Sequence, residues 1–220
     1  MNYTSDLSCY VAYYRDYQKK GKEYFNLNEA IIQTIDSGFQ KSSELNRYKL
    51  LEFKANKEFP SMDISPYYNN LPNSFTDCQN KFMLDAKLYD QGGNELFILL
   101  VHDLFRNCKT ESFSFIGKFN TDFVLNHDFL GYQEVFNNNI LLYRISFKAT
   151  KLLTKGECEM FGNIYIQPND YTIHKLEYSA YQLGREGKED KELYNIIIEY
   201  GYRDRLKSLI ELKYISFNNI

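Results

Sequence analysis

The chain has 220 residues, of which 44% are hydrophobic and 25% charged, a balance typical of a chain that builds a hydrophobic core and not of a disordered one. Its net charge is −3 at pH 7 and it carries no extended basic patch, so no nucleic-acid partner is expected. The longest apolar run, residues 96–101, is far shorter than the roughly 20 residues of a membrane-spanning helix, so none is expected.

Strands are predicted in the N-terminal part at residues 8–17, 23–35 and 48–53. The aromatic share of 17%, with 20 Tyr, 17 Phe and no Trp, favours this interpretation. The lysine-rich residues 19–22 predict a solvated turn between the first two strands. Four tyrosines of the first strand could present their rings to a ligand or partner, although ordinary strand positions are the favoured interpretation: Tyr10, Tyr13, Tyr14 and Tyr17.

The middle of the chain changes character. Residues 56–74 contain three prolines and predict a long loop. Residues 75–88 carry apolar side chains four apart and predict a helix, which the Gly-Gly pair near residue 92 ends. Residues 95–105 predict a second helix, and its apolar run is too continuous to face water, so we expect it to be buried.

The last third gives the clearest pattern. Apolar residues alternate with polar ones, and the turn at residues 168–170 reads Pro-Asn-Asp. Short connections predict an antiparallel meander with one buried and one wet face. The expected strands are residues 142–149, 161–167, 172–183, 192–202 and 206–217.

These elements together predict an α+β fold. We expect a curved antiparallel β-sheet, an incomplete barrel, that wraps the two central helices in a single domain over residues 1–220. The four cysteines form no CxxC pair, so a zinc knuckle is not expected; buried thiols are favoured over disulfides, and the choice stays open for Cys9, Cys78, Cys108 and Cys158.

Two stretches carry a resemblance to a known family. The first comprises YYRD at 13–16, EAII at 29–32 and the basic strand from residue 47; the second comprises GNIYI at 162–166 and YTIHKLEY at 171–178. They resemble the C-terminal region of Bacteroidetes carboxypeptidase-like regulatory domain-containing proteins. Asp16 stands where that family has Glu in its YRE-like triplet, and Gln167 stands where it has Asp after the hairpin strand.

The resemblance implies an envelope protein, in the periplasm or at the outer membrane, with a half-barrel similar to those of lipoprotein-carrier proteins. Residues 1–8 are polar and show no signal peptide, and the family's small N-terminal sandwich is not recognisable, so the chain is interpreted as a fragment. The family implies no catalytic residues for this chain.

Catalytic interpretations start from the three histidines. His174 and Glu177 have the H-x-x-E spacing of a zinc-ligand pair, but residues three apart on a strand point to opposite faces. No metal or other cofactor is therefore expected. His102 and His127 each precede an aspartate, yet sequence adjacency does not orient a histidine, and no G-x-S-x-G motif accompanies them. A hydrolase that uses His102, Asp103, His127 and Glu177 is the alternative.

The leading hypothesis is a non-enzymatic binding or scaffold module of the bacterial envelope. An open curved sheet leaves an apolar concave face, which helices, a lipid-like ligand or an envelope protein must cover. A cytoplasmic protein of unrelated role remains a third possibility, and the oligomeric state is left open. Core packing is the favoured interpretation of the residues that are also the candidate lining of the concave face: Leu96, Phe97, Leu99, Leu100, Phe105, Phe113, Phe115, Tyr143, Ile145 and Phe147.

Overall fold

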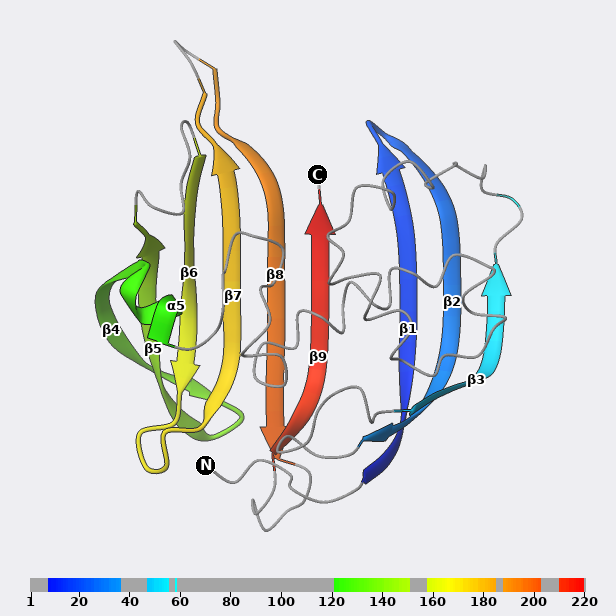
Figure 1. Ribbon diagram of the computed structural model, residues 1–220, viewed down its shortest axis with the longest axis horizontal. Coiled ribbons are helices and arrows are strands. Elements are labelled where there is room, and N and C mark those ends of the chain that lie inside the picture. The colour runs from blue at the N-terminus through cyan, green and yellow to red at the C-terminus, as the bar shows by residue number, and fades with distance from the viewer. Residues whose placement is uncertain are drawn as a thin grey trace. The chain divides into compact units, whose positions relative to one another are not determined.

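The fold is taken from a computed structural model of the chain (Figure 1), which describes residues 8–36, 47–55, 58, 121–150, 158–184, 188–202 and 210–219. These residues form nine strands and one helix, α5 (Thr121–Leu125). The chain divides into two compact units, one of residues 5–100 and the other of residues 101–220 together with 1–4. The single domain expected over residues 1–220 stays a prediction.

The first unit contains a three-stranded antiparallel sheet of β1 (Ser8–Lys20), β2 (Glu23–Asp36) and β3 (Arg47–Ala55), in that order. The three predicted N-terminal strands are confirmed, and β1 is longer than expected. Gly21 lies in the β1–β2 turn with φ of 62°, a left-handed conformation that glycine adopts without steric cost. Tyr14 and Ala30 are opposite each other and buried, whereas Tyr13 and Tyr17 are exposed.

The second unit contains six antiparallel strands that pair in chain order, β4-β5-β6-β7-β8-β9 (Figure 1). The antiparallel meander predicted for the last third is therefore confirmed, while β4 was not predicted. The strands are β4 (His127–Asn137), β5 (Ile140–Ala149), β6 (Cys158–Ile166), β7 (Ile173–Gln182), β8 (Lys191–Tyr202) and β9 (Ile210–Asn219).

The six-stranded sheet has two chemically different faces. Side chains alternate along each strand, and residues directly opposite in an antiparallel pair share a face. We call one face the apolar face; it includes Ile145, Phe147, Ile164, Leu176, Tyr178, Ile196 and Ile198. We call the other the polar face; it includes Ser146, Asn163, Tyr165, Lys175, Glu177, Ser179, Asn195 and Glu199.

Most of the buried side chains described in this sheet lie on the apolar face. Tyr178, Ile196 and Ile198 are each 0% exposed, and full burial of one such side chain contributes about 1.5–3 kcal/mol. Gly162 makes room for the ring of Phe147. A Cβ at position 162 would lie 2.7 Å from Cζ of Phe147 and 2.0 Å from the backbone oxygen of Glu177, so a larger residue does not fit there.

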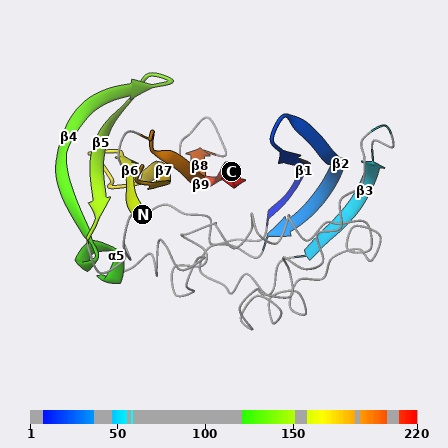
Figure 2. The same cartoon turned by 90° about the horizontal axis from the view of Figure 1, so that it is seen from above.

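The sheet is not flat. Figure 2 shows β4 and β5 bowed along their length. The pairing register shifts between Phe129 and Gly131 of β4, and again where Glu199 and Tyr200 of β8 pair with Tyr214 and Leu212 of β9, so that β9 carries the extra residue. Such bulges add a residue to one strand and bend it, which accounts for local curvature.

The prediction of an α+β fold, with an incomplete barrel around central helices, is wrong. The described residues form two antiparallel sheets, and their one helix, α5, has five residues. The predicted helices at 75–88 and 95–105 lie outside the described residues, as does nearly all of the predicted loop at 56–74. The class assignment depended on apolar spacing in short segments, a signal that does not separate a helix from a buried strand.

Candidate functional site

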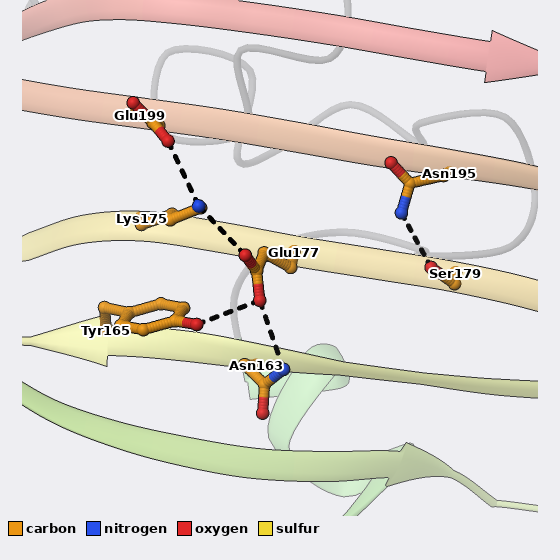
Figure 3. Close-up of polar contacts among 7 residues, drawn as sticks. All are labelled: Asn163, Tyr165, Lys175, Glu177, Ser179, Asn195 and Glu199. Carbon is orange, nitrogen blue, oxygen red and sulfur yellow. Dashed lines mark hydrogen bonds and ion pairs between the residues drawn. The ribbon is translucent and has the colours of Figure 1, made fainter. Parts of the chain in front are cut away.

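A connected group of polar side chains crosses the polar face over β6, β7 and β8 (Figure 3). The carboxylate of Glu177 lies at its centre. Its Oε2 accepts hydrogen bonds from the Tyr165 hydroxyl at 3.0 Å and from Nδ2 of Asn163 at 3.2 Å. Nζ of Lys175 lies 2.9 Å from Oε1 of Glu177 and 3.1 Å from Oε1 of Glu199, so one cation joins two carboxylates.

The group extends to β5 because Ser146 of β5 lies directly opposite Asn163 of β6 in the register. Ser146 is paired with Asn163, and its Oγ donates a hydrogen bond of 2.8 Å to Oδ1 of Asn163. We call the connected residues the polar row: Ser146, Asn163, Tyr165, Lys175, Glu177 and Glu199. A separate pair lies beside it, where Nδ2 of Asn195 donates to Oγ of Ser179 at 2.7 Å (Figure 3).

The charges of the polar row hold one another in their ionised forms. Burial alone would raise the pKa of Glu177, but hydrogen bonds from Lys175, Tyr165 and Asn163 outweigh it and lower that pKa overall. Burial would likewise lower the pKa of Lys175, and its bonds to Glu177 and Glu199 reverse the sign. Both pKa values therefore move away from neutrality, whereas a general acid or base needs a pKa near the working pH.

His127 is buried where β4 begins. Its Nδ1 is 2.8 Å from the backbone oxygen of Phe123 in α5, and its Nε2 is 2.8 Å from the Tyr178 hydroxyl on β7. A carbonyl oxygen can only accept, so Nδ1 carries the proton and Nε2 accepts from Tyr178. Both ring nitrogens of the neutral imidazole are thereby occupied.

The surroundings of His127 are aromatic. The ring stacks on Phe123 with centroids 4.1 Å apart and meets the edge of Phe147 at 5.3 Å, and the residue is 4% exposed. Burial lowers the pKa of His127 below its ordinary 6.5, against the smaller opposing effects of the Phe123 carbonyl and the Asp128 charge. The histidine is therefore neutral at pH 7.

The structure does not bring His127 and Glu177 together. His127 contacts Phe123 and Tyr178, whereas Glu177 is bound within the polar row. His102 and Asp103, the other two residues of the hydrolase hypothesis, lie outside the described residues.

The H-x-x-E pair does not form a shared site either. Nε2 of His174 lies 3.1 Å from Oε1 of Gln167, and the same oxygen accepts a hydrogen bond of 2.6 Å from the Tyr202 hydroxyl. Glu177 instead binds the residues of the polar row. Within the part of the chain that the structure describes, no three His, Cys, Asp or Glu side chains lie close enough to hold a metal ion.

Three of the residues predicted to line an apolar site lie on β5. Phe147 is 1% exposed and belongs to the core, while Tyr143 and Ile145 are half-buried. The other predicted lining residues lie outside the described part: Leu96, Phe97, Leu99, Leu100, Phe105, Phe113 and Phe115. Of the cysteines, Cys9 and Cys158 are free thiols in the described residues, and Cys78 and Cys108 lie outside them.

The aromatic residues of β4 were not predicted from the sequence. Phe129, Tyr132 and Phe136 are 45%, 64% and 76% exposed, and the Tyr132 ring lies 4.9 Å from that of Tyr143. Their register partners on β5 place Tyr132 and Phe136 on the apolar face, and Phe129 joins it through its ring contact with Phe147. The signal in the sequence was the pair of asparagines at 138 and 139, which mark a hairpin turn after β4.

No family model, no curated protein and no solved structure matches this chain. In the part that the structure describes, no helix is both long and apolar enough to pass through a membrane.

Proposed function

We propose that this chain is a non-enzymatic binding module that holds an apolar, lipid-like ligand against the apolar face at β4 and β5. The observation that carries the proposal is the exposed aromatic group formed by Phe129, Tyr132 and Phe136 next to half-buried Tyr143. Large apolar side chains that are exposed together on one face of a strand indicate an interaction site. The resemblance stated above supports a bacterial envelope location as part of this proposal.

The distribution of charge favours an apolar ligand. The strand register places all charged side chains of β5, β6 and β7 on the polar face: Arg144, Lys148, Glu159, Lys175 and Glu177. The apolar face at β4 and β5 carries one acidic residue, Glu134, opposite Tyr143. A ligand with a long apolar part and few charges fits such a surface, because no lysine or arginine there could pair with an anionic group.

The state of the titratable groups supports binding over hydrolysis. Both ring nitrogens of His127 are engaged within the core, and the pKa values of Glu177 and Lys175 are shifted away from neutrality. A hydrolase working through His127 and Glu177 would need them in one place with a proton to exchange.

The test is the recovery and titration of a ligand. Organic extracts and native mass spectra of the purified full chain should contain an amphiphile, and an uncharged dansyl-labelled fatty alcohol should bind saturably. Tyr132→Glu, which puts a charge on the apolar face, should weaken binding of this probe about tenfold, equivalent to ~1.4 kcal/mol. Tyr171→Glu is the matched control, since Tyr171 is 71% exposed but lies in the β6–β7 turn.

Two results would overturn the proposal. One is a chain that yields no amphiphile and shows no saturable probe binding. The other is equal affinity of the Tyr132 and Tyr171 variants, which would place the probe elsewhere on the protein.

A further inference from the structure

We propose that His127 is a pH-sensitive clasp: its neutral ring holds α5 against the six-stranded sheet, and protonation of the ring in acid releases the helix. The inference is independent of the ligand proposed above, since it depends on the contacts of one buried ring and on no bound molecule.

The His127 ring connects three elements. It begins β4, binds the Phe123 carbonyl of α5 through Nδ1, and binds the Tyr178 hydroxyl of β7 through Nε2. A helix of five residues is far below the length that is stable by itself in water, so α5 depends on such contacts. Phe123 is its buried residue, and this side chain stacks on the same imidazole.

Protonation disturbs this arrangement because it turns both ring nitrogens into donors. Nε2 would then donate to the Tyr178 oxygen, and the Tyr178 proton would have to turn to another acceptor. One acceptor near this hydroxyl is Sδ of Met160 at 3.8 Å, which accepts hydrogen bonds weakly. The positive charge would also lie between the rings of Phe123 and Phe147, where an uncompensated charge is costly.

Among the described residues, the groups that face the ring offer little compensation for a positive charge. From β7 the titratable group is Tyr178, whose pKa is raised by burial, so it stays neutral. From β5 the ring meets Phe147, which does not titrate. On α5 the acidic residue is Asp122, which is exposed, and on β4 the exposed Asp128 favours the charged ring less than burial opposes it.

Release of α5 would let the imidazole reach water, where its pKa returns to about 6.5. Protons therefore bind the released form more tightly than the docked form. Below pH 6.5 the equilibrium constant for release rises by up to about tenfold per pH unit, until the docked ring itself titrates.

Amide hydrogen exchange on the full chain measures this equilibrium. The Asn126 amide donates to Asp122 at 3.0 Å and the Thr150 amide donates to Asn126 at 2.8 Å, so both report the docking of α5 and its turn. After correction for intrinsic exchange, their protection should fall between pH 7.5 and pH 5 in step with the NMR titration of the His127 ring. Amides in the centre of β7 should keep their protection.

Two substitutions sharpen the test. His127→Gln keeps a donor and an acceptor but cannot titrate, so the pH dependence of Asn126 and Thr150 protection should disappear. His174→Gln removes the other buried histidine of the described residues and should leave that dependence intact.

The proposal is wrong if the His127 ring titrates at or above pH 6.5, or if the amides of Asn126 and Thr150 stay protected from exchange while the ring is protonated. Both readings come from the unmodified chain, so they decide the question even if His127→Gln fails to fold. An unchanged pH dependence in a folded His127→Gln variant would also overturn it.

Discussion

At Glu177, burial and hydrogen bonding act on one carboxyl group in opposite directions. The side chain is 28% exposed, so water stabilises its carboxylate less in the folded state than in the unfolded chain. Three neighbours from two strands supply the missing solvation, and their effect is larger than that of burial. The folded state therefore binds a proton at Glu177 less readily than the unfolded state does.

The sign of this difference predicts how stability varies with pH. Because the pKa of Glu177 in the folded state is below its ordinary 4.5, the stabilisation is complete above that pH and is lost as pH falls through the folded pKa. Glu177→Gln should lower the free energy of unfolding by about 1–2 kcal/mol at pH 7. The gap should shrink by pH 3.5, as measured by urea denaturation at the two pH values.

Glu159→Gln is the matched control for this prediction. Glu159 pairs with Lys148 at 2.7 Å on the same face, but the two side chains are 39% and 42% exposed, and exposed pairs contribute little. Equal losses in the two variants at pH 7, or a Glu177→Gln loss that persists unchanged in acid, would show that the polar row does not keep Glu177 ionised.

The contacts between individual side chains could not be predicted from the sequence. Strand geometry correctly argued against the His174–Glu177 pair that the H-x-x-E spacing offered, but it could not name the partners Asn163 and Tyr165, which the β6–β7 register sets. His127 stood next to Asp128 in sequence, yet its Nε2 binds Tyr178, 51 residues away. Residue types suggested that these groups could matter, but only the strand pairing decides which of them meet.

The β4–β5 hairpin shows how local chemistry fixes an element. Its two-residue turn places Asn138 at φ of 48° and Asn139 at φ of 63°, the left-handed region that a tight antiparallel turn requires. Asparagine tolerates this region better than other residues with a Cβ, and glycine tolerates it best. The Asn-Asn pair is therefore suited to the turn without being optimal for it.

Substitutions at Asn139 should follow that order. Asn139→Gly should raise the free energy of unfolding by up to about 1 kcal/mol, and Asn139→Val should lower it by about 1–2 kcal/mol, because a β-branched residue resists a positive φ. Asn137→Val is the control, since Asn137 lies in β4 itself, where valine suits an extended backbone. Denaturant melts of the three variants measure the effect, and equal stability of the Asn139→Val and Asn137→Val variants would contradict the argument.

The contrast between two turns explains which elements sequence reasoning recovers. Pro-Asn-Asp at 168–170 was flanked by strands that alternate clearly, as in β7, so the hairpin could be predicted. The strand before Asn138 is exposed on nearly every residue and carries a bulge at Gly131, so it shows no alternation. An edge strand with little buried surface has no hydrophobic period to detect.

For the whole molecule, connection length was the more dependable signal. Short links between the C-terminal strands led to an antiparallel meander, and the six strands do pair in chain order. The α+β class failed because it added helices from segments whose apolar spacing fits two kinds of element. The family resemblance and the envelope location depend on motifs rather than on packing, and they stay predictions.

Surface charge and strand β4 together predict how the whole molecule associates. In the described part of the chain β4 ends the six-stranded sheet and pairs with β5, and this strand carries the exposed side chains of Phe129, Tyr132 and Phe136. Edge strands with exposed apolar side chains tend to pair between copies. The pI is about 5.7, so electrostatic repulsion between copies is weakest near that pH.

We therefore expect the mass from light scattering to rise with concentration near pH 5.7 more steeply than at pH 7.5. Phe136→Lys should suppress that rise, because a lysine on an edge strand opposes pairing between sheets. Tyr171→Lys makes the same change in net charge at a residue of similar exposure, 71% against 76%, outside the edge strand. If both variants suppress association equally, net charge alone controls it and β4 plays no part; if only the Phe136 variant does, the contact between copies lies at this edge.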